Sequence, residues 1–199
     1  IQLPALVFQQ EYLAEFVNLA GAMFKREYIQ IVDSVPELIS ECRHWDLAAS
    51  TKTQADFSVG CRGGLDEYGN VYIKDIVRGR WEYPALIKII KQTALADGQI
   101  VKQTVETAGT QKGLLDILLA EPEMASISLS GITPLADKVT RAQPLLGRAE
   151  HSGIKLLRGS WNSDFINEMC SFPETDHDDQ VDACSGMLLS CATPIQIFL

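Results

Sequence analysis

FSVGCRGGLDEYGNVYIKDIVRG, residues 57–79, contains two β-type runs joined by a tight turn. The runs FSVGCRGG (57–64) and VYIKDIVRG (71–79) flank DEYGN (66–70), whose acidic, asparagine and glycine residues are typical of a hairpin turn. The preceding run RHWDLAAS (43–50) predicts a further strand of the same kind. Three consecutive strands separated by short polar segments predict an antiparallel meander.

Helical and strand patterns alternate after this meander. Apolar residues recur at helical spacing in YPALIKIIKQTALADG (83–98), and the β-type run IVKQTVET (100–107) follows it. We expect further helices at 109–122, 134–150, 160–173 and 178–191, and further strands at 124–132 and 153–159. Alternation implies parallel crossovers, so the sequence predicts an α/β fold with a mixed sheet flanked by helices.

The segment before the meander is expected to lie outside this fold. EYLAEFVNLAGAMFKREY (11–28) has the apolar spacing of an amphipathic helix. Because the chain begins with Ile, we expect it to be a piece of a longer protein, with residues 1–40 forming a linker or helical segment and 41–199 forming one domain.

Composition excludes several classes of protein. The five cysteines form no C-x-x-C pair, so neither a zinc site nor a disulfide framework is indicated. No apolar run approaches the roughly 20 residues needed to cross a membrane. The net charge of −9 argues against binding nucleic acid through overall charge, but residues 138–158 have a local excess of basic side chains. The candidate DNA contacts are Lys138, Arg141, Arg148, Lys155 and Arg158.

Carboxylates occur at three places where the chain enters or leaves the predicted core. Asp46 lies inside the first strand between Trp45 and Leu47, and Glu106 ends the fourth strand. The third place is HDDQVDACSGMLLS (177–190), which begins the last predicted helix. Each acid on its own is compatible with an edge-strand position or a helix cap.

The acids of the last helix have two interpretations. Asp178 or Asp179 could cap the free N–H groups at the helix start, where negative charge is favoured. Alternatively, Asp179 and Asp182 share a face beside Ala183 and Gly186, which leave room for a close neighbour. Like charges placed this way favour a bound cation.

Four motifs in order resemble a known family. They are WDLAAS (45–50) with the AD and SVG that follow, VETAGTQKGLL (105–115), DKVTRAQPLLGRAE (137–150), and FINEMCSFP (165–173) leading into HDDQVDA (177–183). Residues 43–190 thereby resemble the C-terminal nuclease domain of the large terminase subunit of tailed bacteriophages, which has an RNase H-like fold. The leading residues resemble the joint that follows the family's ATPase domain, whose phosphate-binding loop motif this sequence lacks.

The resemblance implies a metal-dependent endonuclease that cuts concatemeric viral double-stranded DNA during genome packaging. It implies that Asp46, Glu106 and Asp179 are catalytic and, with Asp178 or Asp182, bind two Mg2+ or Mn2+ ions. The implied partners are DNA, the terminase small subunit, the portal and the chain's own ATPase domain, with no membrane. The implied location is the host cytoplasm, at the procapsid portal.

Three alternatives remain open on the sequence. A junction resolvase of the same fold would share the acids but act on branched DNA. A DNA-binding and docking module of the packaging motor would cut only in the assembled complex. A protein-interaction domain with vestigial acids would not bind divalent metal saturably.

Overall fold

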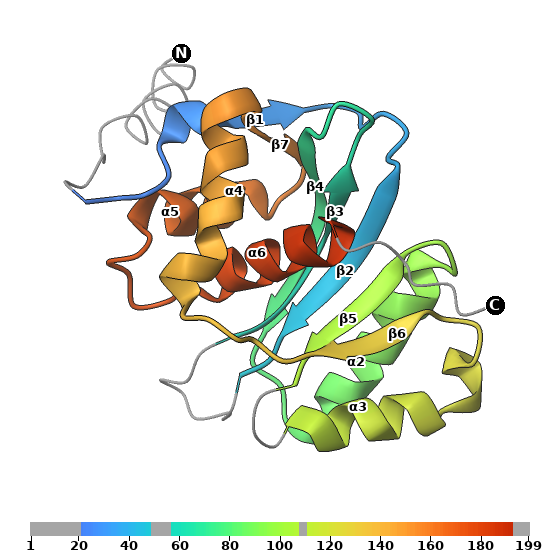
Figure 1. Cartoon of the computed structure of the whole chain (residues 1–199). Coiled ribbons are helices and arrows are strands. Elements are labelled where there is room, and N and C mark those ends of the chain that lie inside the picture. Colours follow the sequence, from blue (N-terminus) through green and yellow to red (C-terminus); the bar gives the residue numbers. More distant parts are fainter. Residues whose placement is uncertain (1–20, 49–56, 108–110, 193–199) are drawn as a thin grey trace, which may run out of the picture.

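A computed structural model describes residues 21–48, 57–107 and 111–192 (Figure 1). In this part of the chain, seven strands form one mixed sheet in the order β1-β7-β4-β3-β2-β5-β6. The strands are β1 (Ile29–Val32), β2 (Ser40–Asp46), β3 (Ser58–Leu65), β4 (Val71–Gly79), β5 (Lys102–Glu106), β6 (Leu129–Ile132) and β7 (Ile154–Leu157). β3 is antiparallel to its neighbours β2 and β4, whereas the other neighbouring pairs are parallel. The predicted meander and the predicted mixed α/β sheet are confirmed.

Helices cover both faces of the sheet (Figure 1). α4 (Lys138–Ser152), α5 (Asn162–Ser171) and α6 (Asp179–Ala192) pack on one face, and α2 (Tyr83–Asp97) and α3 (Gln111–Ala120) on the other. Two short 3-10 helices, η2 (Arg26–Tyr28) and η3 (Pro122–Met124), complete the described elements. None of the described helices combines the length and apolar character that crossing a bilayer requires.

The N-terminal part differs from the expectation. β1 pairs in parallel with β7, so the sheet includes a strand from the segment that we expected to precede the domain. Phe24 is fully buried against Phe172, with ring centroids 6.2 Å apart. Of the helix expected over residues 11–28, residues 11–20 lie outside the described part, and the remainder contains only η2. A four-residue edge strand is too short for its periodicity to be recognised in the sequence.

Gly186 allows α6 to lie directly against β2. A Cβ added at residue 186 would lie 2.2 Å from Cδ2 and 2.3 Å from Nε2 of His44, which is a buried side chain of β2. At the next residue of α6, the Cys42 Sγ of β2 donates to the Met187 carbonyl at 3.4 Å. The small residues noted in the sequence therefore provide the expected room for a close neighbour, and that neighbour is a strand of the sheet.

We expect Gly186→Ala to lower the free energy of unfolding by roughly 1–3 kcal/mol, because the added methyl group overlaps the confined His44 ring. Urea unfolding measures this change. The matched control is Gly147→Ala on the exposed side of α4, where a Cβ meets nothing within 4 Å. That control should stabilise the chain by roughly 0.5–1 kcal/mol through helix propensity. Equal effects of the two substitutions would contradict the close approach.

Candidate functional site

The topology places Asp46 and Glu106 side by side. Asp46 is the last residue of β2 and Glu106 is the last residue of β5. These strands are parallel neighbours with Trp45 opposite Val105, so their carboxyl ends meet at one edge of the sheet. An acid that ends one such strand therefore lies next to the acid that ends the other.

α6 begins at the same edge and brings in the third acid. Phe57, which directly precedes β3, donates its backbone N–H to Asp179 Oδ2 at 3.1 Å. Asp46 pairs in register with Val59, two residues further along β3. Asp179 and Asp182 are both nearly buried in the first turn of α6. Asp46, Glu106, Asp179 and Asp182 therefore face a common region, and we call these four residues the acidic cluster.

Electrostatics within the acidic cluster follow from this proximity. Burial, together with the nearby Glu106, Asp182 and Asp179, raises the pKa of Asp46 well above its usual value. Burial is also the main reason that the pKa of Asp182 is raised to about 6, although the Arg141 guanidinium opposes this shift. Carboxylates that raise the pKa of a neighbour create a site where a cation is favourable.

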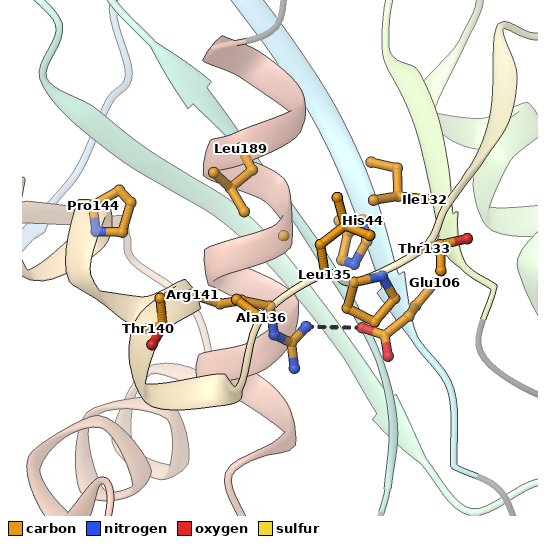
Figure 2. Close-up of a pocket in the computed structure, with 12 residues that line it drawn as sticks. His44, Glu106, Ile132, Thr133, Leu135, Ala136, Thr140, Arg141, Pro144 and Leu189 are labelled. Carbon is orange, nitrogen blue, oxygen red and sulfur yellow. Dashed lines mark hydrogen bonds and ion pairs between the residues drawn. The ribbon is translucent and has the colours of Figure 1, made fainter.

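Arg141 contacts two members of the cluster, and Figure 2 shows the contact with Glu106. Its Nη1 donates to Glu106 Oε2 at 2.9 Å, and its Nη2 lies 3.1 Å from Asp182 Oδ1. The second contact is an ion pair and not a hydrogen bond, because Asp182 Oδ1 is buried without a hydrogen-bond partner. The Arg141 Nε is also buried without a hydrogen-bond partner. Beside the cluster, Lys138 Nζ donates to Asp178 Oδ2. Side chains predicted to contact DNA are thus paired with the acids.

The donor atoms of the cluster fit a hard divalent cation. All are carboxylate oxygens, the ligands that Mg2+ and Mn2+ prefer, and Asp182 Oδ1 accepts no hydrogen bond. Over residues 21–48, 57–107 and 111–192, however, no three His, Cys, Asp or Glu side chains are close enough to hold one metal ion. The acids are at one edge, with a guanidinium between two of them.

The other predicted basic residues do not form one surface with this site. Arg148 donates to the carbonyl of Gly69, in the β3–β4 turn at the opposite edge of the sheet. Lys155 is the second residue of β7, toward that same distant edge. Arg158 Nε lies 2.6 Å from Asp33 Oδ1, directly after the end of β7. In the sheet, β4 and β3 lie between β7 and β2. The single basic surface that the sequence suggests is therefore divided among three places.

His44 is a site residue that the sequence analysis did not single out. It is buried, and its Nδ1 lies 2.8 Å from Thr104 Oγ1. Burial, and secondarily the Arg141 charge, lowers the pKa of His44 to about 3, so the imidazole is neutral at physiological pH. Its position two residues before Asp46, on the same face of the strand, is the signal that could have identified it.

A pocket of about 320 Å³ borders the acidic cluster (Figure 2). His44, Glu106 and Arg141 contribute to its lining, and the remaining walls are largely apolar. They come from the end of β6 and the segment after it, from α4 and from α6: Ile132, Thr133, Pro134, Leu135, Ala136, Thr140, Pro144, Gly186 and Leu189. The Glu106–Arg141 ion pair is therefore accessible from a cavity next to the sheet edge.

No protein-family model and no curated protein sequence matches this chain. Solved structures match it clearly, and each shares only 12–14% sequence identity with it. The large terminase nuclease from thermophilic phage G20c with bound magnesium matches with a TM-score of 0.61, and the match covers 85% of this chain and 97% of the G20c chain. The zinc-bound form of the same nuclease matches with a TM-score of 0.57, over 81% of this chain and 94% of the G20c chain. The human cytomegalovirus terminase nuclease domain, soaked with manganese and inhibitor-bound, matches with a TM-score of 0.61, over 77% of this chain and 83% of the cytomegalovirus chain. The chain therefore has the RNase H-like fold of terminase nuclease domains.

We expect Asp182→Asn to stabilise the metal-free chain by roughly 1–3 kcal/mol at pH 7.5. The pKa of Asp182 rises on folding from 3.8 to about 6, so the folded chain binds this proton more tightly. The resulting stability is fully present below about pH 4 and is lost as the pH rises through 6. Asn imitates the neutral acid and avoids this loss.

Urea unfolding in EDTA at pH 4 and pH 7.5 measures the effect, with Asp116→Asn on the exposed side of α3 as the control. The stabilisation should be confined to the higher pH and absent from the control. Equal stability of Asp182→Asn and the unchanged chain at pH 7.5 would contradict the raised pKa.

Proposed function

We propose that this chain is the nuclease domain of a terminase large subunit and that it cleaves double-stranded DNA with divalent metal ions. The observation that carries the proposal is the meeting of acids from β2, β5 and α6 at one sheet edge, on a fold shared with terminase nucleases. Those neighbours were solved with magnesium, zinc, cobalt or manganese. Their metals support a divalent ion as the cofactor here.

Asp46, Glu106 and Asp179 would hold two Mg2+ or Mn2+ ions. Such ions, when bound, activate a water molecule and stabilise the charge that develops on the attacking and leaving oxygens of a phosphodiester. Asp46 lies among the other acids and is the candidate to contact both ions. Asp182 acts electrostatically on Asp46, whereas Lys138 holds Asp178, so Asp182 is the better candidate for an additional ligand.

The chain's own residues orient these acids before metal binds. The Phe57 N–H donates to Asp179 Oδ2 and so holds this side chain at the sheet edge. Arg141 balances the charge of Glu106 and Asp182 and lies where a substrate phosphate would also be attracted. Contacts of this kind recognise the DNA backbone and carry no base code, so we propose cleavage with low sequence specificity.

The biological setting is part of the same proposal. The substrate would be concatemeric viral DNA, cut at the start and end of genome packaging by a tailed bacteriophage. The small terminase subunit, the portal and an ATPase domain of the same protein would be the partners, in the host cytoplasm at the procapsid portal. These partners would determine where the domain cuts.

We expect the chain to convert supercoiled plasmid to linear and fragmented DNA in Mn2+ or Mg2+, and to lose this activity in EDTA. Asp46→Asn should lower the cleavage rate at least 100-fold, in the range seen when a group that stabilises the transition state is removed. Gel electrophoresis of the plasmid over time measures the rate. Asp116→Asn, which makes the same change outside the acidic cluster, should retain the rate of the unchanged chain.

Cleavage that persists in EDTA or in Asp46→Asn would refute the proposal. Linear duplexes and four-way junctions assayed in parallel distinguish a terminase-like nuclease from a junction resolvase. A strong preference for the junction would replace the proposed substrate with branched DNA.

One observation favours a second candidate, a docking module whose cleavage is suppressed outside the assembled motor. Arg141 occupies the space between Glu106 and Asp182, and a positive charge there opposes a metal ion. Coulomb repulsion between this guanidinium and a cation at the cluster weakens binding of the cation. Binding partners could draw Arg141 away and so favour metal binding.

We expect Arg141→Gln to raise the affinity for Mn2+ roughly tenfold, because it removes this competing charge. Isothermal titration calorimetry without DNA measures the affinity. Lys138→Gln, which releases the neighbouring Asp178, is the matched comparison and should have the smaller effect. An unchanged Mn2+ affinity in Arg141→Gln would rule out competition by the guanidinium.

A further inference from the structure

The Phe57 ring is sandwiched between two arginines at the sheet edge that carries the acids. The Cζ atoms of Arg78 and Arg80 lie 3.8 and 3.7 Å from the ring centroid. Two guanidinium groups cannot share one face of a ring at this distance, so they lie on opposite faces. Each contact has the geometry of a cation–π interaction.

The two arginines differ in their surroundings. The Arg78 side chain is 24% exposed, and its Nη2 lies 3.4 Å from Glu168 Oε2 of α5. Glu168 also accepts hydrogen bonds from the backbone N and Nε2 of Gln180, both at 2.6 Å, in the first turn of α6. Arg78 is thus fixed to the helices. Arg80 follows the end of β4 and is exposed to solvent.

The sandwich adjoins the acidic cluster. Gly79 pairs with Ser58, so Phe57 and Arg80 lie at the edge where β2 ends. The Phe57 backbone N–H binds Asp179 directly. The exposed guanidinium of Arg80 is therefore separated from the acidic cluster by little more than one aromatic residue.

We infer that Arg80, held by the Phe57 ring, contacts a phosphate of the DNA strand next to the phosphate that lies at the acidic cluster. This inference rests on the proposed nuclease function. The chain has a net charge of −9, so attraction to DNA requires cations close to the acidic cluster, and the exposed Arg80 guanidinium on the Phe57 ring is one of these. A guanidinium fork binds phosphate oxygens in a bidentate manner.

Stacking on Phe57 explains why this position suits an arginine. A long exposed side chain normally loses rotamer freedom when it binds a ligand, and this loss weakens binding. The ring restricts Arg80 before DNA arrives, so less freedom is lost in the complex. Because the contact is to the backbone, it should strengthen binding to all sequences equally.

The test measures duplex binding by fluorescence anisotropy in EDTA, which prevents cleavage, over a series of salt concentrations. Arg80→Ala should raise the Kd at least fivefold and reduce the slope of log K against log salt by about 1, the change expected for one lost phosphate contact. Arg80→Lys keeps the charge and should retain the slope while binding more weakly than the unchanged chain. Lys88→Ala, on the exposed side of α2 across the sheet, is the matched control and should change neither quantity.

The outcomes separate this inference from the proposed function. A chain that binds no duplex at low salt would overturn both. Duplex binding by the unchanged chain, with the same Kd and salt slope in Arg80→Ala and Lys88→Ala, would overturn the phosphate contact alone. Thermal unfolding of Arg80→Ala should show a folded chain with at most a slightly lower Tm, since only one exposed cation–π contact is lost. An Arg80→Ala effect limited to one DNA sequence would also contradict a backbone contact.

Discussion

The contact between α6 and β2 at Gly186 determines where the acids of this protein lie. His44 fills the space that a side chain at residue 186 would need. Its Nδ1 meets Thr104 Oγ1 of β5, which lies 3.1 Å from Ser190 Oγ of α6. β2, β5 and α6 are therefore joined below the site by small polar groups and one neutral imidazole. These are the three elements that carry the acidic cluster, so the distances between the carboxylates depend on this contact.

The charge balance at the site is a second consequence of that packing. Four carboxylates meet at one sheet edge, and burial raises the pKa of Asp46 and Asp182. Arg141 partly compensates them through its contacts with Glu106 and Asp182. The net negative charge that remains at this edge is therefore smaller than the number of carboxylates indicates.

Particular residues show why some of this could be predicted and some could not. The resemblance to terminase nucleases assigned Asp46 and Glu106 to one site, and the parallel pairing of β2 with β5 brings these two strand ends together. The contacts of Arg141 with Glu106 and Asp182 depend on how α4 packs on the sheet, and a run of basic residues in the sequence does not reveal this packing. Arg78 and Phe57 were also missed, because their spacing in sequence does not reveal that a hairpin brings them together. β1 has only four residues and gives no periodic signal.

The acids of the site come from positions 46, 106 and 179, and the last of them begins the final described helix. Residues of β2 and β5, with their two carboxylates, are synthesised before those of α6. The third carboxylate joins them only when α6 packs across the sheet, which requires residues up to at least Gly186. Assembly of the acidic cluster is therefore a late event in the folding of this region. A polypeptide that ends before α6 would lack the third carboxylate and also the apolar side chains that α6 packs against the sheet.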